Sequence, residues 1–174
     1  MTFLDAPPGS RRPLYVFLII TLAVGAGASL FTTPQIPTWY ASLHHPAIAP
    51  PNYIFGPVWT TLYILMAIAA WLVWKKTGWR SVEMAAFGFQ LALNFAWSAI
   101  FFALHSIGGA LIEIIILDLA ILATTILFFR RDWVAGLLFL PFGGYTEDQI
   151  IRPTRDFIPA GVDFLQEEVQ QLLP

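Results

Sequence analysis

The sequence predicts an all-α membrane protein. Of its 174 residues, 57% are hydrophobic and only 11% are charged, whereas a soluble domain carries about 25% charged residues. The charged residues gather in a few short clusters and leave long apolar runs between them. The chain has no cysteine, which excludes a disulfide framework and thiolate chemistry. Its basic residues come in pairs between apolar runs, so we expect no nucleic-acid partner.

The first apolar run predicts a membrane helix over residues 14–31. A polar segment, residues 1–13, precedes it and ends in Arg11 and Arg12. Neither a convincing cleavage site nor a soluble domain follows the run, so a retained helix explains it better than a signal peptide. Three small residues in this run would let another helix approach closely: Gly25, Gly27 and Ala28.

Three further apolar runs predict helices over about residues 55–74, 82–104 and 110–129. A fifth run, residues 133–142, has only about ten apolar residues, whereas a spanning helix needs about 20. The tail that follows, residues 143–174, carries six acidic and two basic groups and is therefore unlike the apolar body.

The basic residues predict the orientation of the chain. They precede the first helix, follow the second and follow the fourth, whereas the loops after the first and third helices contain no Lys or Arg. This alternation places the N-terminus on the cytoplasmic side. The loop between the first two helices then lies on the outer side.

That loop forms a stiff aromatic cap, residues 39–51, which contains no Lys, Arg, Asp or Glu. Pro46, Pro50 and Pro51 lack an amide donor and bias the preceding residues toward extended geometry, so a regular helix is not expected here. An uncharged aromatic cap that leads into a membrane helix suggests a cover over an apolar ligand site.

Two linked motifs are similar to the TspO/MBR family, the tryptophan-rich sensory proteins related to the mitochondrial translocator protein. The motifs are PPNYIFGPVWTTLYILM (Pro50–Met66) and QLALNFAWSAIFF (Gln90–Phe102). The resemblance covers roughly residues 14–142. It implies a five-helix transmembrane bundle, often a homodimer, that binds porphyrins and sterol-like molecules beneath the loop joining the first two helices.

The C-terminus departs from the resemblance at about residue 143. The family's fifth helix continues after a Leu-Pro pair with an apolar, tryptophan-containing segment, but here Leu140 and Pro141 are soon followed by charged residues. Each Asp or Arg at a helix centre costs about 2.5–3.5 kcal/mol in a membrane. The fifth helix is therefore expected to be truncated or replaced. A shifted reading frame or a recombined 3′ end is our hypothesis, and resequencing the locus tests it.

Aromatic and amide side chains form the candidate ligand site. Ring faces can stack on a flat conjugated ligand, and indole N–H and phenol O–H groups can hold its carboxylates. Gln90, Asn94 and Trp97 share one helical face, as do Trp59 and Tyr63. The alternatives are interfacial aromatic residues and ordinary packing between helices. The candidate ligand-binding residues are Trp39, Pro50, Pro51, Phe55, Trp59, Tyr63, Gln90, Asn94, Trp97 and Phe101.

Other polar residues are weaker candidates. His44, His45 and His105 could ligate heme iron, but solvated loop histidines are the favoured interpretation. Glu113 lies near the outer end of its helix, where we expect it to reach water. Asp118 lies deeper and is expected to be neutral or to face a wet cleft.

Small residues on the third predicted helix recur at three- and four-residue spacing. Such stripes allow close helix association in lipid, although packing within one chain would use them equally well. The family's dimer favours a homodimer interface formed by Gly88, Ala92, Ala96, Ala99 and Ala103.

Together the residues and the resemblance predict an integral membrane protein that binds, and transports or senses, tetrapyrroles such as porphyrin or heme, or sterol-like ligands. Porphyrin or heme is expected as ligand, with no obligatory cofactor, no metal site and no assigned catalytic residue. The alternatives are a light-dependent porphyrin-degrading enzyme and a product impaired by the loss of its fifth helix.

Overall fold

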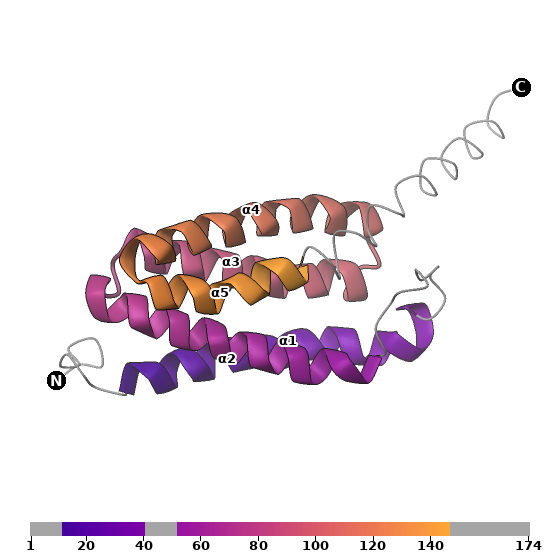
Figure 1. The fold of residues 1–174 in the computed structure, drawn as a ribbon. Coiled ribbons are helices and arrows are strands. Elements are labelled where there is room, and N and C mark those ends of the chain that lie inside the picture. The colour runs from indigo at the N-terminus through magenta and orange to yellow at the C-terminus, as the bar shows by residue number, and fades with distance from the viewer. Residues whose placement is uncertain (1–11, 41–51, 147–174) are drawn as a thin grey trace, which may run out of the picture.

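Five helices make up the part of the chain that the structure, a computed structural model, describes (Figure 1). This part comprises residues 12–40 and 52–146, with the backbone alone at 52–55 and 144–146. The helices are α1 (Arg12–Gln35), α2 (Asn52–Thr77), α3 (Val82–Ser98), α4 (Ile107–Arg131) and α5 (Trp133–Thr146), and π-helical turns η2 (Ile36–Tyr40) and η3 (Ala99–Ala103) extend α1 and α3.

The helices run up and down and pack as a closed ring. Helix α2 packs between α1 and α5, α4 packs between α5 and α3, and α3 returns to α1 (Figure 1). Four segments are long and apolar enough to cross a membrane: Arg12–Tyr40, Gly56–Thr77, Val82–Ala103 and Ile107–Arg131. The predicted all-α membrane bundle is therefore confirmed.

Over the residues that the structure describes, α5 is the shortest helix of the ring. Its 14 residues give a length of about 21 Å at about 1.5 Å per residue, less than the roughly 30 Å hydrocarbon core of a bilayer. The structure continues this helix through Pro141 to Thr146, four residues beyond the predicted end.

A tight turn joins the end of α2 to the start of α3. Gly78 has φ 74°, a left-handed conformation that glycine tolerates, and its N–H donates to the carbonyl of Trp74 at 2.8 Å to close α2. Three residues later, Ser81 Oγ accepts a hydrogen bond from the N–H of Met84 at 3.2 Å and caps the start of α3. The chain therefore reverses within four residues.

The π-helical turns correct two predicted helix ends. The first helix does not stop at residue 31 but continues to Tyr40, so Trp39 belongs to its last turn rather than to an irregular cap. Pro34 and Pro37 interrupt the usual hydrogen bonds there, and a wider turn avoids the clash between a proline ring and the carbonyl four residues earlier. In the third helix, the last predicted turn is π-helical from Ala99. The rest of the predicted cap lies outside the described residues.

Small residues bring the helices together. On α2, Ala67, Ala69 and Ala70 are fully buried. On α1, a Cβ added to Gly25 would lie 2.5 Å from the ring of Tyr63, and one added to Gly27 would lie 3.0 Å from Phe95. Because lipid tails are as apolar as the helix surfaces, such close packing replaces the hydrophobic effect as the main source of cohesion. The predicted close approach at these glycines is confirmed.

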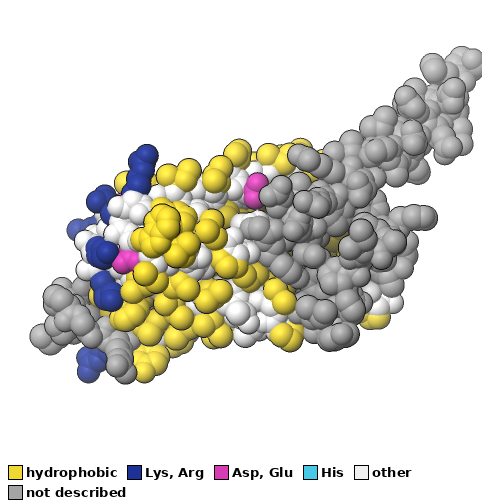
Figure 2. All heavy atoms as spheres, in the orientation of Figure 1, with side chains coloured by type: hydrophobic (Ala, Val, Ile, Leu, Met, Phe, Trp, Pro, Cys, Tyr) yellow, Lys and Arg dark blue, Asp and Glu magenta, His cyan; other side chains and the backbone are white. Residues whose placement is uncertain are grey.

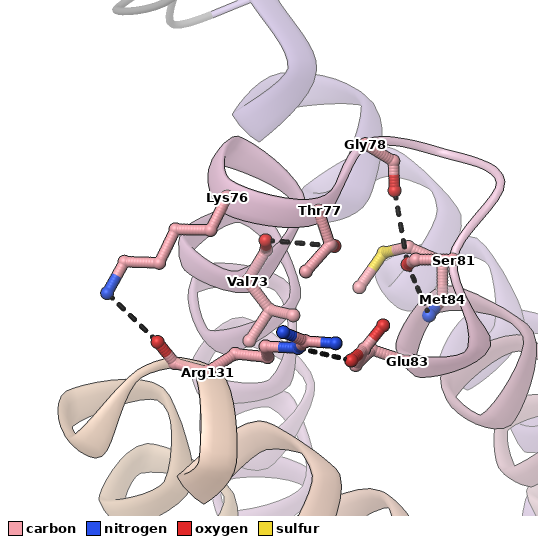
Figure 3. A network of polar contacts seen from close by, with 8 residues as sticks. All are labelled: Val73, Lys76, Thr77, Gly78, Ser81, Glu83, Met84 and Arg131. Atoms are coloured by element: carbon pink, nitrogen blue, oxygen red, sulfur yellow. Dashed lines mark hydrogen bonds and ion pairs between the residues drawn. The ribbon is translucent and has the colours of Figure 1, made fainter.

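One end of the bundle carries the Lys and Arg residues of the described helices and turns, because these residues lie where α1 begins and where α2 and α4 end (Figure 2). Figure 3 shows Arg131 reaching from α4 to Glu83 at the start of α3, with Nε 2.5 Å from Oε1. In the same network Lys76 donates to the carbonyl of Arg131 at 3.0 Å. Lys76 also lies 2.8 Å from Asp132. These contacts join α2, α3 and α4 at one end.

Candidate functional site

A buried hydrogen bond between α2 and α3 forms the polar centre of the candidate site. The hydroxyl of Tyr63 donates to Oδ1 of Asn94, and both side chains are about 5% exposed. The ring of Tyr63 lies against Gly25 of α1, where no side chain could fit without moving it. Three helices therefore fix the position of this phenol–amide pair.

Gln90 lies one turn from Asn94 on the same face of α3. Its side chain is fully buried, and its Nε2 lies 3.8 Å from the sulfur of Met66, a weak acceptor. Its Oε1 accepts no hydrogen bond from any described residue. The structure thus places both predicted amides inside the bundle, with one carbonyl oxygen left without a donor.

An outer aromatic cluster lies at the opposite end from the basic residues. Trp97 stacks on Phe101 with ring centroids 5.0 Å apart, and Trp39 meets Phe101 edge-on at 5.0 Å. Phe102 contacts Trp39, Trp97 and Phe101. Trp97 also packs against the main core, so it connects the outer aromatic cluster to the region around Asn94.

Trp59 connects the second helix to α5. Its ring lies 5.9 Å from that of Tyr63 and 6.0 Å, edge-on, from that of Phe142. The described part of α5 therefore supplies one aromatic side chain next to the predicted site, although the helix is short.

The structure brings together seven of the ten predicted ligand-binding residues in two adjoining groups. Trp39, Trp97 and Phe101 form the outer group, and Trp59, Tyr63, Gln90 and Asn94 form the inner one. Pro50, Pro51 and the side chain of Phe55 lie outside the described residues, as do His44 and His45.

Two contacting aromatic residues were missed by the sequence reasoning. Phe102 follows Phe101 directly, and only the π-helical turn brings both rings against Trp39 and Trp97. Phe142 lies in the short fifth apolar run, and no pattern in that run indicates that its ring meets Trp59.

His105 is exposed, as predicted, but it is not simply solvated. Its ring stacks on Trp39 with centroids 4.5 Å apart, and its Nε2 lies 3.3 Å from Oε1 of Gln35. It adopts φ 51° in the loop before α4. Within residues 12–40 and 52–146 no group of three His, Cys, Asp or Glu side chains is arranged to hold a metal ion.

Of the two carboxylic acids of α4, Glu113 differs from the expectation. It does not reach water: it is 7% exposed, and neither carboxyl oxygen has a hydrogen-bond partner among the described residues. Although Glu113 is near the outer end of α4, its side chain lies on the face that packs inward. Asp118 is half-buried, and its expected neutral state or wet cleft stays a prediction.

The predicted dimer residues lie on the outside of α3 and η3. Gly88, Ala92 and Ala103 are exposed, and Ala96 and Ala99 are half-buried. A Cβ added to Gly88 would meet no atom within 4 Å. This stripe is therefore open on its outer side, although η3 interrupts its regular α-helical spacing.

The chain is similar in sequence to membrane proteins of one family. The sequence pattern of the TspO/MBR family matches residues 17–146. The tryptophan-rich protein TspO of Archaeoglobus fulgidus is 38% identical over 76% of this chain and 86% of its own length. Protein CrtK of Rhodobacter capsulatus is 35% identical over 73% and 79%, and the human translocator protein is 38% identical over 60% and 64%. With about three quarters of the chain matched and four helices long and apolar enough to cross a membrane, the protein belongs to the TspO/MBR family.

Proposed function

We propose that this protein binds tetrapyrroles such as porphyrin or heme, or sterol-like molecules, within its bundle, and transports or senses them. Two adjoining groups of aromatic rings, one from η2, α3 and η3 and one from α2 and α5 beside the buried Tyr63–Asn94 pair, carry this proposal. Relatives named translocator protein and tryptophan-rich sensory protein support transport and sensing, respectively.

The chemistry of the site suits a flat apolar ligand that carries a few polar groups. Aromatic rings offer faces and edges for a conjugated or polycyclic framework. The unpaired Oε1 of Gln90 and the amide of Asn94 offer a small number of hydrogen bonds, which fix orientation in an otherwise apolar pocket. Ligand binding requires the aromatic side chains to separate, because they contact one another in this structure.

We further propose that the basic end of the bundle faces the cytoplasm and that ligands enter near the outer aromatic cluster. The positive-inside rule supports this orientation, since the described Lys and Arg residues lie at one end (Figure 2). The open small-residue stripe on α3 supports a homodimer, with Gly88 and Ala92 at the interface.

Titration of the purified protein with protoporphyrin IX, followed by quenching of tryptophan fluorescence, tests the proposed function. Saturable quenching is expected, with weaker affinity in Trp59→Ala and Trp97→Ala. Trp133→Ala is the matched control, because Trp133 is 68% exposed at the basic end of α5. Absence of saturable binding by the unchanged protein would overturn the proposal and favour a product impaired in its fifth helix.

Illumination of the complex separates binding from enzymatic breakdown. Binding alone leaves the porphyrin spectrum unchanged under light. Bleaching that requires Trp59, whose ring contacts both Tyr63 and Phe142, would instead identify a light-dependent porphyrin-degrading enzyme.

A further inference from the structure

Glu113 is a buried carboxyl group that is not among the proposed ligand-binding residues. It is 7% exposed inside a helix of membrane-spanning length, and both of its oxygens lack a hydrogen-bond partner among the described residues. An ionisable group inside a membrane bundle is expensive to maintain and points to a function by default.

The fold places Glu113 beside the candidate ligand site. Three residues earlier on the same face of α4, Ala110 packs into the outer aromatic cluster with Phe101 and Phe102. At the same end a Cβ added to Gly109 would lie 3.3 Å from the side chain of Ile100 in η3. One residue further on, Ile114 belongs to the main core. On α4, Glu113 therefore lies between a residue of the outer aromatic cluster, Ala110, and a residue of the main core, Ile114.

Within the described residues, no hydrogen bond joins Glu113 to a charged side chain. His105, in the loop before α4, is exposed and stacks on Trp39. Residues 84–104 of α3 and η3 contain no titratable side chain, and α5 contains only Tyr145. On α2, Tyr63 donates its hydroxyl to Asn94, while Lys75 and Lys76 lie at the basic end. Asp118, on the same helix, has the same sign of charge.

A carboxyl group in such surroundings is more favourable as the neutral acid, because an isolated ion in a low-dielectric interior has no compensating partner. The neutral acid has one O–H donor and a carbonyl acceptor. Its donor is the group that an anionic ligand carboxylate needs, and a hydrogen bond to an ionised acceptor is about twice as strong as one between neutral groups.

We propose that Glu113, as a neutral carboxylic acid, donates a hydrogen bond to a carboxylate group of the ligand and so selects amphipathic ring compounds that carry an acid. This inference rests on the proposed function, and it adds a chemical requirement: the bound ligand has a carboxylate, and binding depends on the proton that Glu113 holds. Ionisation of Glu113 at higher pH would replace this hydrogen bond with repulsion between two carboxylates.

Protoporphyrin IX and its dimethyl ester test the proposal, because they differ only in the two carboxylates. Titrations of the full chain between about pH 6 and about pH 9 keep the free acid ionised, since carboxyl groups titrate near pH 4 in water. For the unchanged protein, affinity for the diacid should fall as pH rises, while affinity for the ester should not change.

Two substitutions make the test specific to Glu113. Glu113→Ala should weaken diacid binding about tenfold or more and leave ester binding unchanged, which also shows that the variant is folded. Glu113→Gln keeps a donor in its amide N–H, so it should restore most of the affinity and remove the pH dependence.

The outcomes distinguish this inference from the proposed function. Equal diacid affinity in Glu113→Ala and the unchanged protein, at every pH, would overturn the role of Glu113 alone. A parallel loss of ester binding would also overturn it, because the effect would then be structural. Failure of the unchanged protein to bind either probe would overturn both proposals.

Discussion

At Tyr63, helix packing and the polar wall of the candidate site depend on the same side chain. The ring fills the space left by Gly25 on α1, and the hydroxyl reaches Asn94 on α3. The backbone of one helix thus positions the donor that satisfies an amide on another. A change on either side of the ring should affect both the stability of the bundle and its ability to bind a ligand.

Tyr63→Phe removes the hydroxyl and leaves Oδ1 of Asn94 without its donor. We expect a loss of about 0.6 to about 1.7 kcal/mol in the free energy of unfolding, the range measured for hydrogen bonds between membrane helices. Unfolding in sodium dodecyl sulfate, followed by circular dichroism, measures this loss. Tyr15→Phe is the control, since Tyr15 is 58% exposed and should give no change.

Gly25→Ala tests the close approach of α1 to α2. The new methyl group would lie 2.5 Å from the ring of Tyr63, so the ring or the helix must move. We expect lower stability, by about 1 to about 3 kcal/mol, and weaker porphyrin binding. Gly108→Ala has no atom within 4 Å of its Cβ and serves as the control. Equal stability of both variants would show that α1 is not held against Tyr63.

At the scale of the elements, Asp132 joins the ends of three helices. Its Oδ1 accepts a hydrogen bond from the N–H of Ala135 at 3.0 Å and caps α5, and its Oδ2 lies 2.8 Å from Lys76 at the end of α2. Its own N–H donates to the last turn of α4. The hydrogen bond from Lys76, followed by that from Ala135, lowers the pKa of Asp132 below its ordinary value.

This lowered pKa has a defined effect on stability. A carboxylate whose pKa is lower in the folded state stabilises the fold above its unfolded pKa of about 4 and loses that contribution as pH falls through the folded pKa. We expect Asp132→Ala to cost about 1 kcal/mol at neutral pH through loss of the cap, and Asp132→Asn, which keeps a capping oxygen, to cost less. The difference in the free energy of unfolding between Asp132→Asn and the unchanged protein should disappear in acid. A difference that persists in acid would show that the charge of Asp132 is not its cause.

The positions of the long helices can be predicted from the sequence, whereas their π-helical turns and the contacts between them cannot. Hydropathy and charge placed the four spanning helices, because a membrane selects directly for apolar length. The turn η2 instead follows Pro34 and contains Pro37, whose missing N–H groups hydropathy does not register, and no residue type in η3 marks its wider turn. The burial of Glu113 and the contact of Phe142 with Trp59 depend on which face of a helix meets its neighbour, and only the assembled ring determines this.

At the scale of the whole molecule, the ring of helices has members of unequal length. Helix α5 packs between α2 and α4 and brings Phe142 to Trp59, and its Gly143 reaches the level of Ile121 on α4. The outer half of α4, where Glu113 lies eight residues before Ile121, extends beyond this level. Completing the fifth helix should therefore change ligand binding more than it changes the contacts at the basic end of the bundle.

A chain with a completed fifth helix tests whether the length of α5 limits ligand binding. Replacing residues 147–174 with an apolar, tryptophan-containing segment of about ten residues would bring α5 to spanning length. We expect several-fold tighter binding of protoporphyrin IX and a higher unfolding temperature in detergent, because the added turns would cover the outer halves of α2 and α4. A Gly/Ser segment of equal length is the control. If both chains bind porphyrin equally well, the four long helices and the present α5 already form a competent site, and the atypical C-terminus does not limit binding.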